Sequence, residues 1–213
     1  MHRLILTYIN IILFIYLLLV GSIDSRRTLR NYIVYNQYLS QFRQNQFSVY
    51  DQSEKNLLCR IESSSEYSFN RLNNLILYPF NQTIASINNL WSPYMYQAHI
   101  NILDVKLNKW MSGQIYQSYS SQGFQFRIEY RRKYYIMENK VDSLITEIRD
   151  EKRSNYILTR FYQISNDIIF SSSSSSSKYK IQVYTNDLPH PLYMLALYAF
   201  DSIRLNRVII FIP

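Results

Sequence analysis

The sequence predicts a mainly β protein: a closed antiparallel barrel in two pseudo-repeated halves around a buried C-terminal helix, preceded by an N-terminal apolar helix. Three observations lead to this prediction. One strand–turn–strand pattern occurs twice, a stretch near the C-terminus is apolar on every side, and residues that favour strands are abundant, with 21 Tyr and 11 Phe. The length of 213 residues suits one domain with a leader and is ample for a buried core.

The N-terminal helix has the features of a targeting or anchoring segment. A basic start, Met1–Arg3, precedes the apolar stretch Leu4–Val20, and the small residues that end at Ser22 are of the kind that signal peptidase accepts. Two alternatives stay open: residues 1–22 are a signal peptide cleaved after Ser22, with secretion of the rest, or Leu4–Val20 remains as a membrane anchor. Both place the chain in the secretory pathway. The arginines that follow would hold the C-terminal side of an uncleaved helix in the cytosol.

Residues 47–61 and 134–148 are two copies of one pattern, and they align without a gap. In the first copy, alternation from Phe47 to Asp51 predicts a strand with one buried face. The polar stretch 52–56 has the length of a hairpin loop, and a second alternating strand follows it. Each copy therefore predicts a hairpin, and the duplication predicts a fold built in two halves.

The turns between strands must be made with little glycine, because the chain contains only 3 Gly. We therefore expect Asn, Asp and Ser to make them, for example at positions 73–74, 88–89 and 166–167. The serine run Ser171–Ser177 is polar and of low complexity, and it is expected to form a flexible loop between strands.

The stretch Leu192–Phe200 consists only of apolar and aromatic residues, and its Ala, Leu and Met favour a helix. It is too short to span a bilayer, and a helix that is apolar on all sides is a buried helix. We expect a helix over about residues 188–204, with Asp201 marking the point where it leaves the apolar interior. A last short strand is expected over residues 207–212.

Strands around one central C-terminal helix, in two pseudo-repeated halves, resemble the tubby C-terminal-like fold, and in particular the LURP-one-related proteins and the phospholipid scramblases. The segments that carry the resemblance are the hairpins at 47–61 and 134–148, the strand Thr83–Trp91 with its terminal Trp, and the stretch from Asp187 through the helix to Asp201. The resemblance covers about residues 30–213 and implies a single domain over residues 23–213 with a barrel of about twelve strands. The acidic calcium loop and the cysteine-rich stretch of the scramblases have no counterpart here. The resemblance therefore implies the fold, and not calcium-activated scrambling.

Signals for catalysis are weak. No Cys/His cluster has metal-ligand spacing, and no glycine-rich loop is present to hold phosphate. Cys59 could in principle pair with His99 or His190, but structural roles fit these residues better. The sequence therefore indicates a protein that is not an enzyme, with no catalytic residue, metal site or cofactor. Asn81, in the sequon Asn-Gln-Thr, is a glycosylation candidate if the domain is lumenal.

The basic balance is the main functional clue, with 23 Lys and Arg against 15 Asp and Glu and a net charge of +8. The densest cluster lies where the predicted strand Gly123–Tyr130 turns into the next one. The candidate site for anionic lipid headgroups consists of Arg127, Arg131, Arg132 and Lys133. The same cations could hold nucleic-acid phosphate, but a secretory leader argues against nucleic acid. The alternative is that these cations bind no ligand and form a turn that only keeps the protein soluble.

The function expected from these features is that of a non-enzymatic tubby-like or LURP-one-like module, acting in the secretory pathway or at a membrane surface. Its expected partner is anionic membrane lipid. The alternative is a secreted β-rich protein that binds lipid or glycan and has no membrane role. The two alternatives differ in whether Leu4–Val20 is retained in the mature protein.

Overall fold

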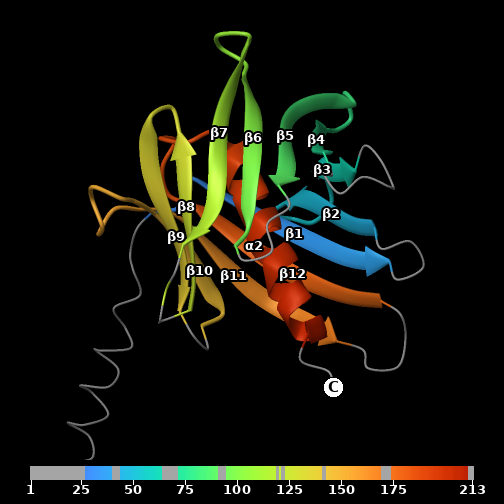
Figure 1. The fold of residues 1–213 in the computed structure, drawn as a ribbon. Coiled ribbons are helices and arrows are strands. Elements are labelled where there is room, and N and C mark those ends of the chain that lie inside the picture. The colour runs from blue at the N-terminus through green and yellow to red at the C-terminus, as the bar shows by residue number, and fades with distance from the viewer. Residues whose placement is uncertain are drawn as a thin grey trace, which may run out of the picture.

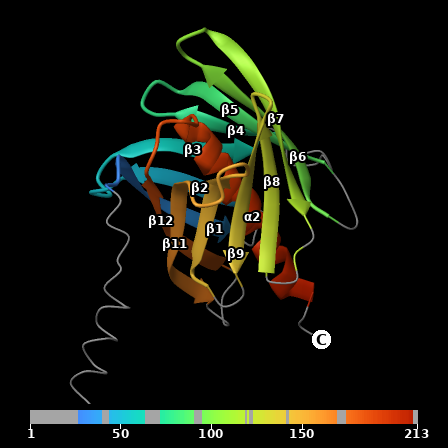
Figure 2. The ribbon, with the colours of Figure 1, turned by 90° about the vertical axis from the view of Figure 1, so that its left-hand side faces the viewer.

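The computed structural model describes residues 27–39, 44–63, 72–90, 95–118, 120, 123–140, 143–168 and 174–210. These residues form a closed barrel of twelve antiparallel strands, in which each strand pairs with the next one in the sequence and β12 pairs back with β1. A single described helix, α2, runs through the middle of the barrel (Figures 1 and 2). The mainly β barrel around a C-terminal helix is confirmed. The elements are β1 (Arg30–Leu39), β2 (Gln44–Asp51), β3 (Leu57–Ser63), β4 (Leu72–Leu77), β5 (Gln82–Leu90), β6 (Gln97–Asp104), β7 (Lys109–Ser118), β8 (Gly123–Tyr130), β9 (Lys133–Lys140), β10 (Ile145–Asp150), β11 (Ile157–Ile168), β12 (Ser174–Val183) and α2 (His190–Ile210).

The helix α2 fills the barrel as predicted. Every side chain from Leu192 to Phe200 is buried, and aromatic rings of the strands pack edge-on against it. Phe47 of β2 contacts Tyr198 with ring centroids 5.6 Å apart, and Phe124 of β8 contacts Phe200 at 5.9 Å. Burial of apolar surface on all sides of the helix makes it the centre of the core.

One expectation about the end of α2 was confirmed and one was wrong. Among the helix residues whose side chains are described, Asp201 is the last buried one, since residues 202–204 after it are only half-buried, and its own carboxylate is fully buried. It accepts hydrogen bonds from Asn36 Nδ2 and Tyr179 Oη, and Arg204 Nη2 lies 3.6 Å from it. Such partners offset the cost of burying a charge. The helix also continues to Ile210, so residues 207–210 are helical and not a strand. A short aliphatic run is compatible with either a strand or a helix. Residues 207–210 are helical because the backbone hydrogen bonding of α2 continues through them.

Both duplicated segments form hairpins of the one barrel, β2–β3 and β9–β10, and the loop 52–56 lies where it was expected. The ungapped correspondence between them is not kept. Phe47 pairs with Ile61 in the first hairpin, whereas Ile148, the equivalent of Ile61, pairs with Met137 and not with Tyr134. Side chains alternate between the two faces of a strand, so an odd shift in register exchanges the buried and exposed sets.

Two expectations about turns and loops were also wrong. The asparagine pairs at 73–74 and 88–89, and residues 166–167, lie inside β4, β5 and β11. Ser174–Ser177, expected in a loop, belong to β12 and pair with β1, and Ser175–Ser177 also pair with β11. Residues 171–173 lie outside the described residues. A strand ladder uses only backbone groups, so pairing on both sides overrides the weak local preference of these residues. The left-handed backbone positions that make the turns are Glu54, Asn81, Asn108, Arg131 and Arg132.

The expectations for the N-terminal segment fall on residues that are not described. These are the signal peptide over residues 1–22, its cleavage after Ser22 and the anchor through Leu4–Val20. In the part of the chain that is described, no helix has the length and apolar character needed to cross a membrane.

Candidate functional site

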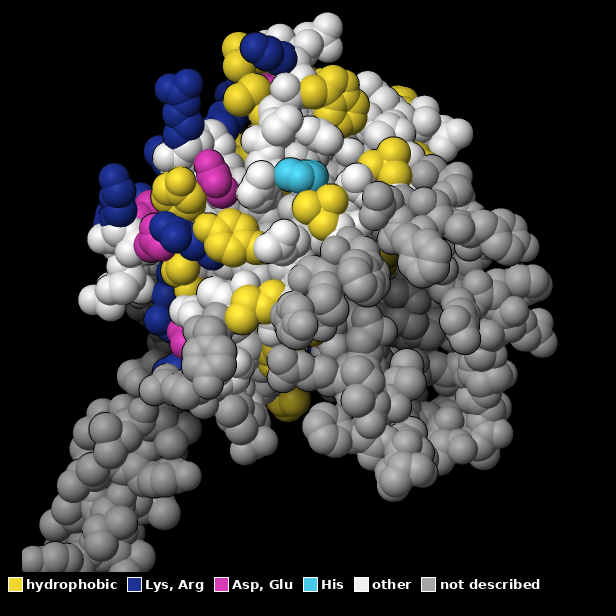
Figure 3. Space-filling view, viewed as in Figure 1, with side chains coloured by type: hydrophobic (Ala, Val, Ile, Leu, Met, Phe, Trp, Pro, Cys, Tyr) yellow, Lys and Arg dark blue, Asp and Glu magenta, His cyan; other side chains and the backbone are white. Residues whose placement is uncertain are grey.

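One end of the barrel carries the candidate site. Because the strands alternate in direction along the chain, every second connection lies at the same end. The chain also enters β1 and α2 at this end. We call it the basic rim, and it consists of the connections 52–56, 78–81, 105–108, 131–132, 151–156 and 184–189. In Figure 3, Lys and Arg side chains gather along one margin and at the top of the visible face, where Figure 1 places β8 to β10 and the end of the β6–β7 hairpin.

The predicted cationic turn is a two-residue connection between β8 and β9. Arg131 and Arg132 form it with φ of 53° and 60°, and Tyr130 pairs with Lys133 across it. Two successive positive φ values define the hairpin turn for which Asn-Gly is the preferred sequence. Arginine carries a Cβ and no short polar group to support this backbone, so both residues hold an unfavourable conformation. The prediction that the cations lie at a hairpin turn is confirmed.

The four predicted site residues do not all offer a free charge. Arg127 on β8 bonds to Glu151 at 3.0 Å, and its guanidinium lies 4.3 Å from the ring centroid of Tyr134. Arg131 forms an ion pair with Asp104 at the end of β6. Arg132 and Lys133 are exposed and form no ion pair with any residue that the structure describes. The charge available to a ligand therefore centres on these last two residues.

The neighbouring β6–β7 hairpin brings a feature that the sequence interpretation missed. Gly113 pairs with Tyr130, but β7 begins at Lys109, so four residues of β7 extend past the β8–β9 turn. The end of this hairpin is apolar as well as basic. Val105, Leu107 and Trp110 are 79%, 66% and 47% exposed, and both Lys106 and Lys109 are exposed between them. The signal in the sequence was the pair of apolar residues Val105 and Leu107 within a turn, because turns are normally polar.

The turn at the end of the hairpin is held in place by Asp104. Its Oδ1 accepts the backbone N–H groups of Lys106 at 3.0 Å and Leu107 at 3.2 Å. The Leu107 N–H, together with Arg131, lowers the pKa of Asp104 below its ordinary value, so the carboxylate stays ionised at neutral pH. Asp104 therefore orders the hairpin end and joins it to the cationic turn.

A hollow of about 700 Å³ opens on the outer surface between the extended hairpin and the cationic turn. Gly113 lies at its base, where a Cβ would meet the backbone oxygen of Glu129 at 2.4 Å, so no larger residue fits without movement. The hollow is lined by His99, Leu107, Met111, Ser112, Gly113, Gln114, Glu129, Arg131 and Arg132. Its lining combines the carboxylate of Glu129 and the paired Arg131 with the exposed Arg132, so its charges are mixed.

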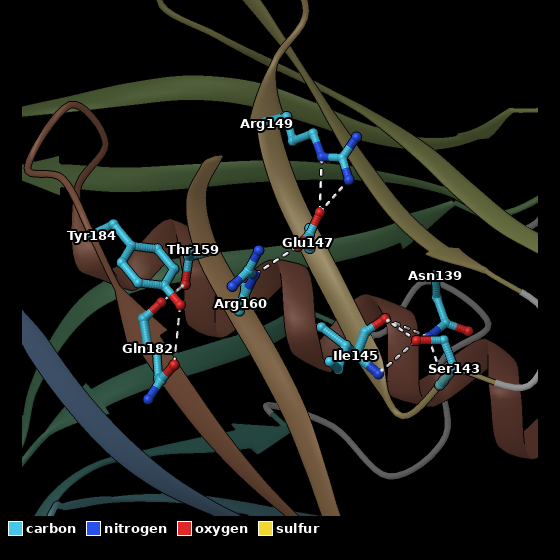
Figure 4. A network of polar contacts seen from close by, with 9 residues as sticks. All are labelled: Asn139, Ser143, Ile145, Glu147, Arg149, Thr159, Arg160, Gln182 and Tyr184. Carbon is cyan, nitrogen blue, oxygen red and sulfur yellow. Dashed lines mark hydrogen bonds and ion pairs between the residues drawn. The ribbon is translucent and has the colours of Figure 1, made fainter. Parts of the chain in front are cut away.

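A second polar cluster lies on the outer face of β10, β11 and β12, and all its charges are paired (Figure 4). Glu147 accepts Arg149 Nε at 2.9 Å and Arg160 Nε at 2.6 Å. Burial alone would raise the pKa of Glu147, but the bonds from both arginines outweigh burial and lower it. Arg160 also lies 5.8 Å from the ring centroid of Tyr184. The cluster connects three strands and presents no open anion site.

Within the described residues, no hydrogen bond joins Cys59 to His99 or His190. Cys59 faces the core, and burial raises the pKa of its thiol to about 12, so it stays protonated and unreactive. His99 is exposed on β6, and His190 at the start of α2 bonds to Tyr32. Among the described residues, no group of three or more His, Cys, Asp or Glu side chains could hold a metal ion.

The glycosylation candidate Asn81 is exposed in the turn between β4 and β5, with φ of 51°. Its neighbour Phe80 is 75% exposed. The turn belongs to the basic rim, so a glycan on Asn81 would stand at the same end as the cationic turn.

Fold and site together define a helix-filled β-barrel with a basic and partly apolar rim. Comparison with protein-family models, curated proteins and solved structures finds no match to this chain. The grounds for assigning a function are therefore the barrel architecture and the chemistry of the basic rim.

Proposed function

We propose that this protein is a non-enzymatic module of the tubby-like kind that binds the surface of anionic membranes through its basic rim. The observation that carries the proposal is the pair Arg131-Arg132. These two residues occupy a left-handed turn that other residues would form at lower cost. Strained backbone positions are concentrated at functional sites. Arg131 is paired with Asp104, so Arg132 is the residue of this turn whose charge is open to a ligand.

Anionic lipid suits the rim better than a compact ligand. Four exposed cations lie in two connections of the basic rim or at the first residue of the strand that follows, and they do not converge on one enclosed pocket: Lys106, Lys109, Arg132 and Lys133. A surface of fixed negative charge engages such an array, at about 1 kcal/mol for each cation near the membrane. The leader over residues 1–22 agrees with a place in the secretory pathway, where this surface would meet lipid.

The test is sedimentation of the full chain with neutral phosphatidylcholine vesicles and with vesicles that contain phosphatidylserine. Wild type is expected to prefer the anionic vesicles, with a preference that falls as salt rises. The double variant R132A/K133A should bind them roughly 30-fold more weakly, from two cations at about 1 kcal/mol each. The N-terminal segment is the same in both proteins, so any contribution from it cancels in the ratio of their vesicle affinities.

The matched control is K140A. Lys140 is exposed like Arg132 and carries one charge, but it lies at the opposite end of β9. R132A alone should weaken anionic binding clearly more than K140A does. Equal losses would mean that only net charge matters. A wild type without any anionic preference would contradict the proposal and leave secreted lipid or glycan binding as the function to test.

A further inference from the structure

We infer that the end of the β6–β7 hairpin enters the lipid bilayer, with Val105, Leu107 and Trp110 as the inserted side chains. The inference rests on the proposed membrane role and adds a second mode of contact to it. Val105 is the most exposed large hydrophobic side chain among the described residues, and Leu107 is 66% exposed. Exposed apolar groups that gather in one place mark a site of interaction.

The backbone of the turn that presents Val105 and Leu107 is held by hydrogen bonds. Asp104 accepts the N–H groups of Lys106 and Leu107, and Asn108 completes the turn with φ of 45°. Arg131 pairs with the same carboxylate from the neighbouring turn. The hairpin end is therefore organised before any ligand binds, and little ordering is needed on insertion.

The geometry matches the layers of a membrane surface. The four residues of β7 that extend past the β8–β9 turn correspond to about 13 Å along a strand. With Arg132 and Lys133 at the level of the headgroups, the hairpin end reaches the boundary of the acyl chains, about 5–10 Å deeper. Trp and Lys side chains are typical of this depth, because their apolar parts enter lipid while their polar ends stay at the interface.

The charge on the hairpin selects a lipid surface over an apolar protein partner. Lys106 and Lys109 stand on either side of Leu107, and Arg132 and Lys133 follow on the next turn. An occupant must therefore be apolar at its centre and negative around it. A bilayer with anionic headgroups has this arrangement at every point of its surface.

The experiment uses the fluorescence of Trp110 in the full-length variant W91F, which leaves Trp110 as the one tryptophan of the chain. Vesicles contain phosphatidylserine, with or without bromine on the acyl chains. Insertion is expected to shift Trp110 emission to the blue and to make bromolipid quench it. The variant W91F/L107D should lose most of the shift and bind at least tenfold more weakly.

The matched control is W91F/L144D. Leu144 is 64% exposed, close to Leu107, but it lies at the opposite end of the barrel. It should keep both the shift and the binding, and thermal melts should show all variants folded. Salt-sensitive binding without a shift or quenching overturns insertion and leaves the proposed function intact. Absence of binding to anionic vesicles overturns both. A blue shift that depends on protein concentration without lipid would show that a second copy covers the hairpin and would overturn the inference.

Discussion

At the scale of single residues, the cationic turn shows a conflict between local backbone preference and charge. Arg131 and Arg132 occupy positions that favour Asn and Gly, and Arg132 forms no ion pair with the described residues that would offset its strain. A turn selected only for stability would carry a different sequence. The residue that weakens the fold is thus the residue proposed to meet the membrane.

This conflict predicts that R132G changes stability and binding in opposite directions. The left-handed backbone costs a residue with a Cβ about 1–2 kcal/mol, and the greater chain entropy of glycine offsets about 0.5–1 kcal/mol of this gain. The free energy of unfolding should therefore rise by roughly 0.5–1 kcal/mol. Binding to anionic vesicles should weaken, because one cation is lost. R132A is the control: it should lose the same binding without gaining stability. Urea denaturation and vesicle sedimentation measure the two effects, and a gain in both would disprove the functional reading of Arg132.

At the scale of elements, the start of α2 is joined to β1 by a half-buried histidine. His190 Nδ1 bonds to the Tyr32 hydroxyl, and Nε2 lies 3.3 Å from Asn186 Oδ1. Burial, with a contribution from the nearby Arg30, lowers the pKa of His190 below its ordinary value. The ring of Tyr193 also lies beside it, with centroids 6.2 Å apart. Folding therefore favours the neutral imidazole.

The shift predicts that the protein loses stability in mild acid. The unfolded chain binds a proton at His190 more readily than the folded chain, so the free energy of unfolding should fall as pH drops from about 7 to about 5. The carboxylates with lowered pKa, such as Asp104 and Glu147, lose their contribution only at lower pH. Denaturation of wild type and H190Q at both pH values measures the effect. If the free energy of unfolding fell as much with pH in H190Q as in wild type, the assignment of the effect to His190 would be wrong.

At the scale of the whole molecule, barrel and helix depend on one another. The inner faces of the strands point at α2, and no other described segment fills the space. Leu195 and Leu197 are completely buried at its centre. A barrel of this width without its helix would be an apolar shell open to water, which cannot be stable.

We predict that L197A lowers the free energy of unfolding by about 2–5 kcal/mol, because the cavity cannot be refilled by rigid strands. A chain that ends at Asp187 should not melt cooperatively at all. L144A, at an exposed leucine, is the control and should leave stability within about 0.5 kcal/mol. A soluble truncated chain with a sharp melting transition would show that the barrel does not need its helix.

Much of the architecture followed from local patterns. Nine successive apolar residues from Leu192 to Phe200 determine a buried helix, because no other environment in a folded domain accepts them. Alternation in 47–61 and 134–148 determines hairpins, and three cations between two strands determine a basic turn. These features depend only on neighbours in the chain, so the sequence is enough to predict them.

The tertiary structure decided what depends on distant partners. Backbone pairing with neighbouring strands placed Ser174–Ser177 and the asparagine pairs inside strands. The register of Gly113 with Tyr130 set how far the β6–β7 hairpin extends, and so exposed Leu107 and Trp110. Asp104 paired with Arg131, and this contact across 27 positions reduced the free charge of the predicted site. Register and ion pairing arise between segments far apart in sequence, and local patterns do not encode them.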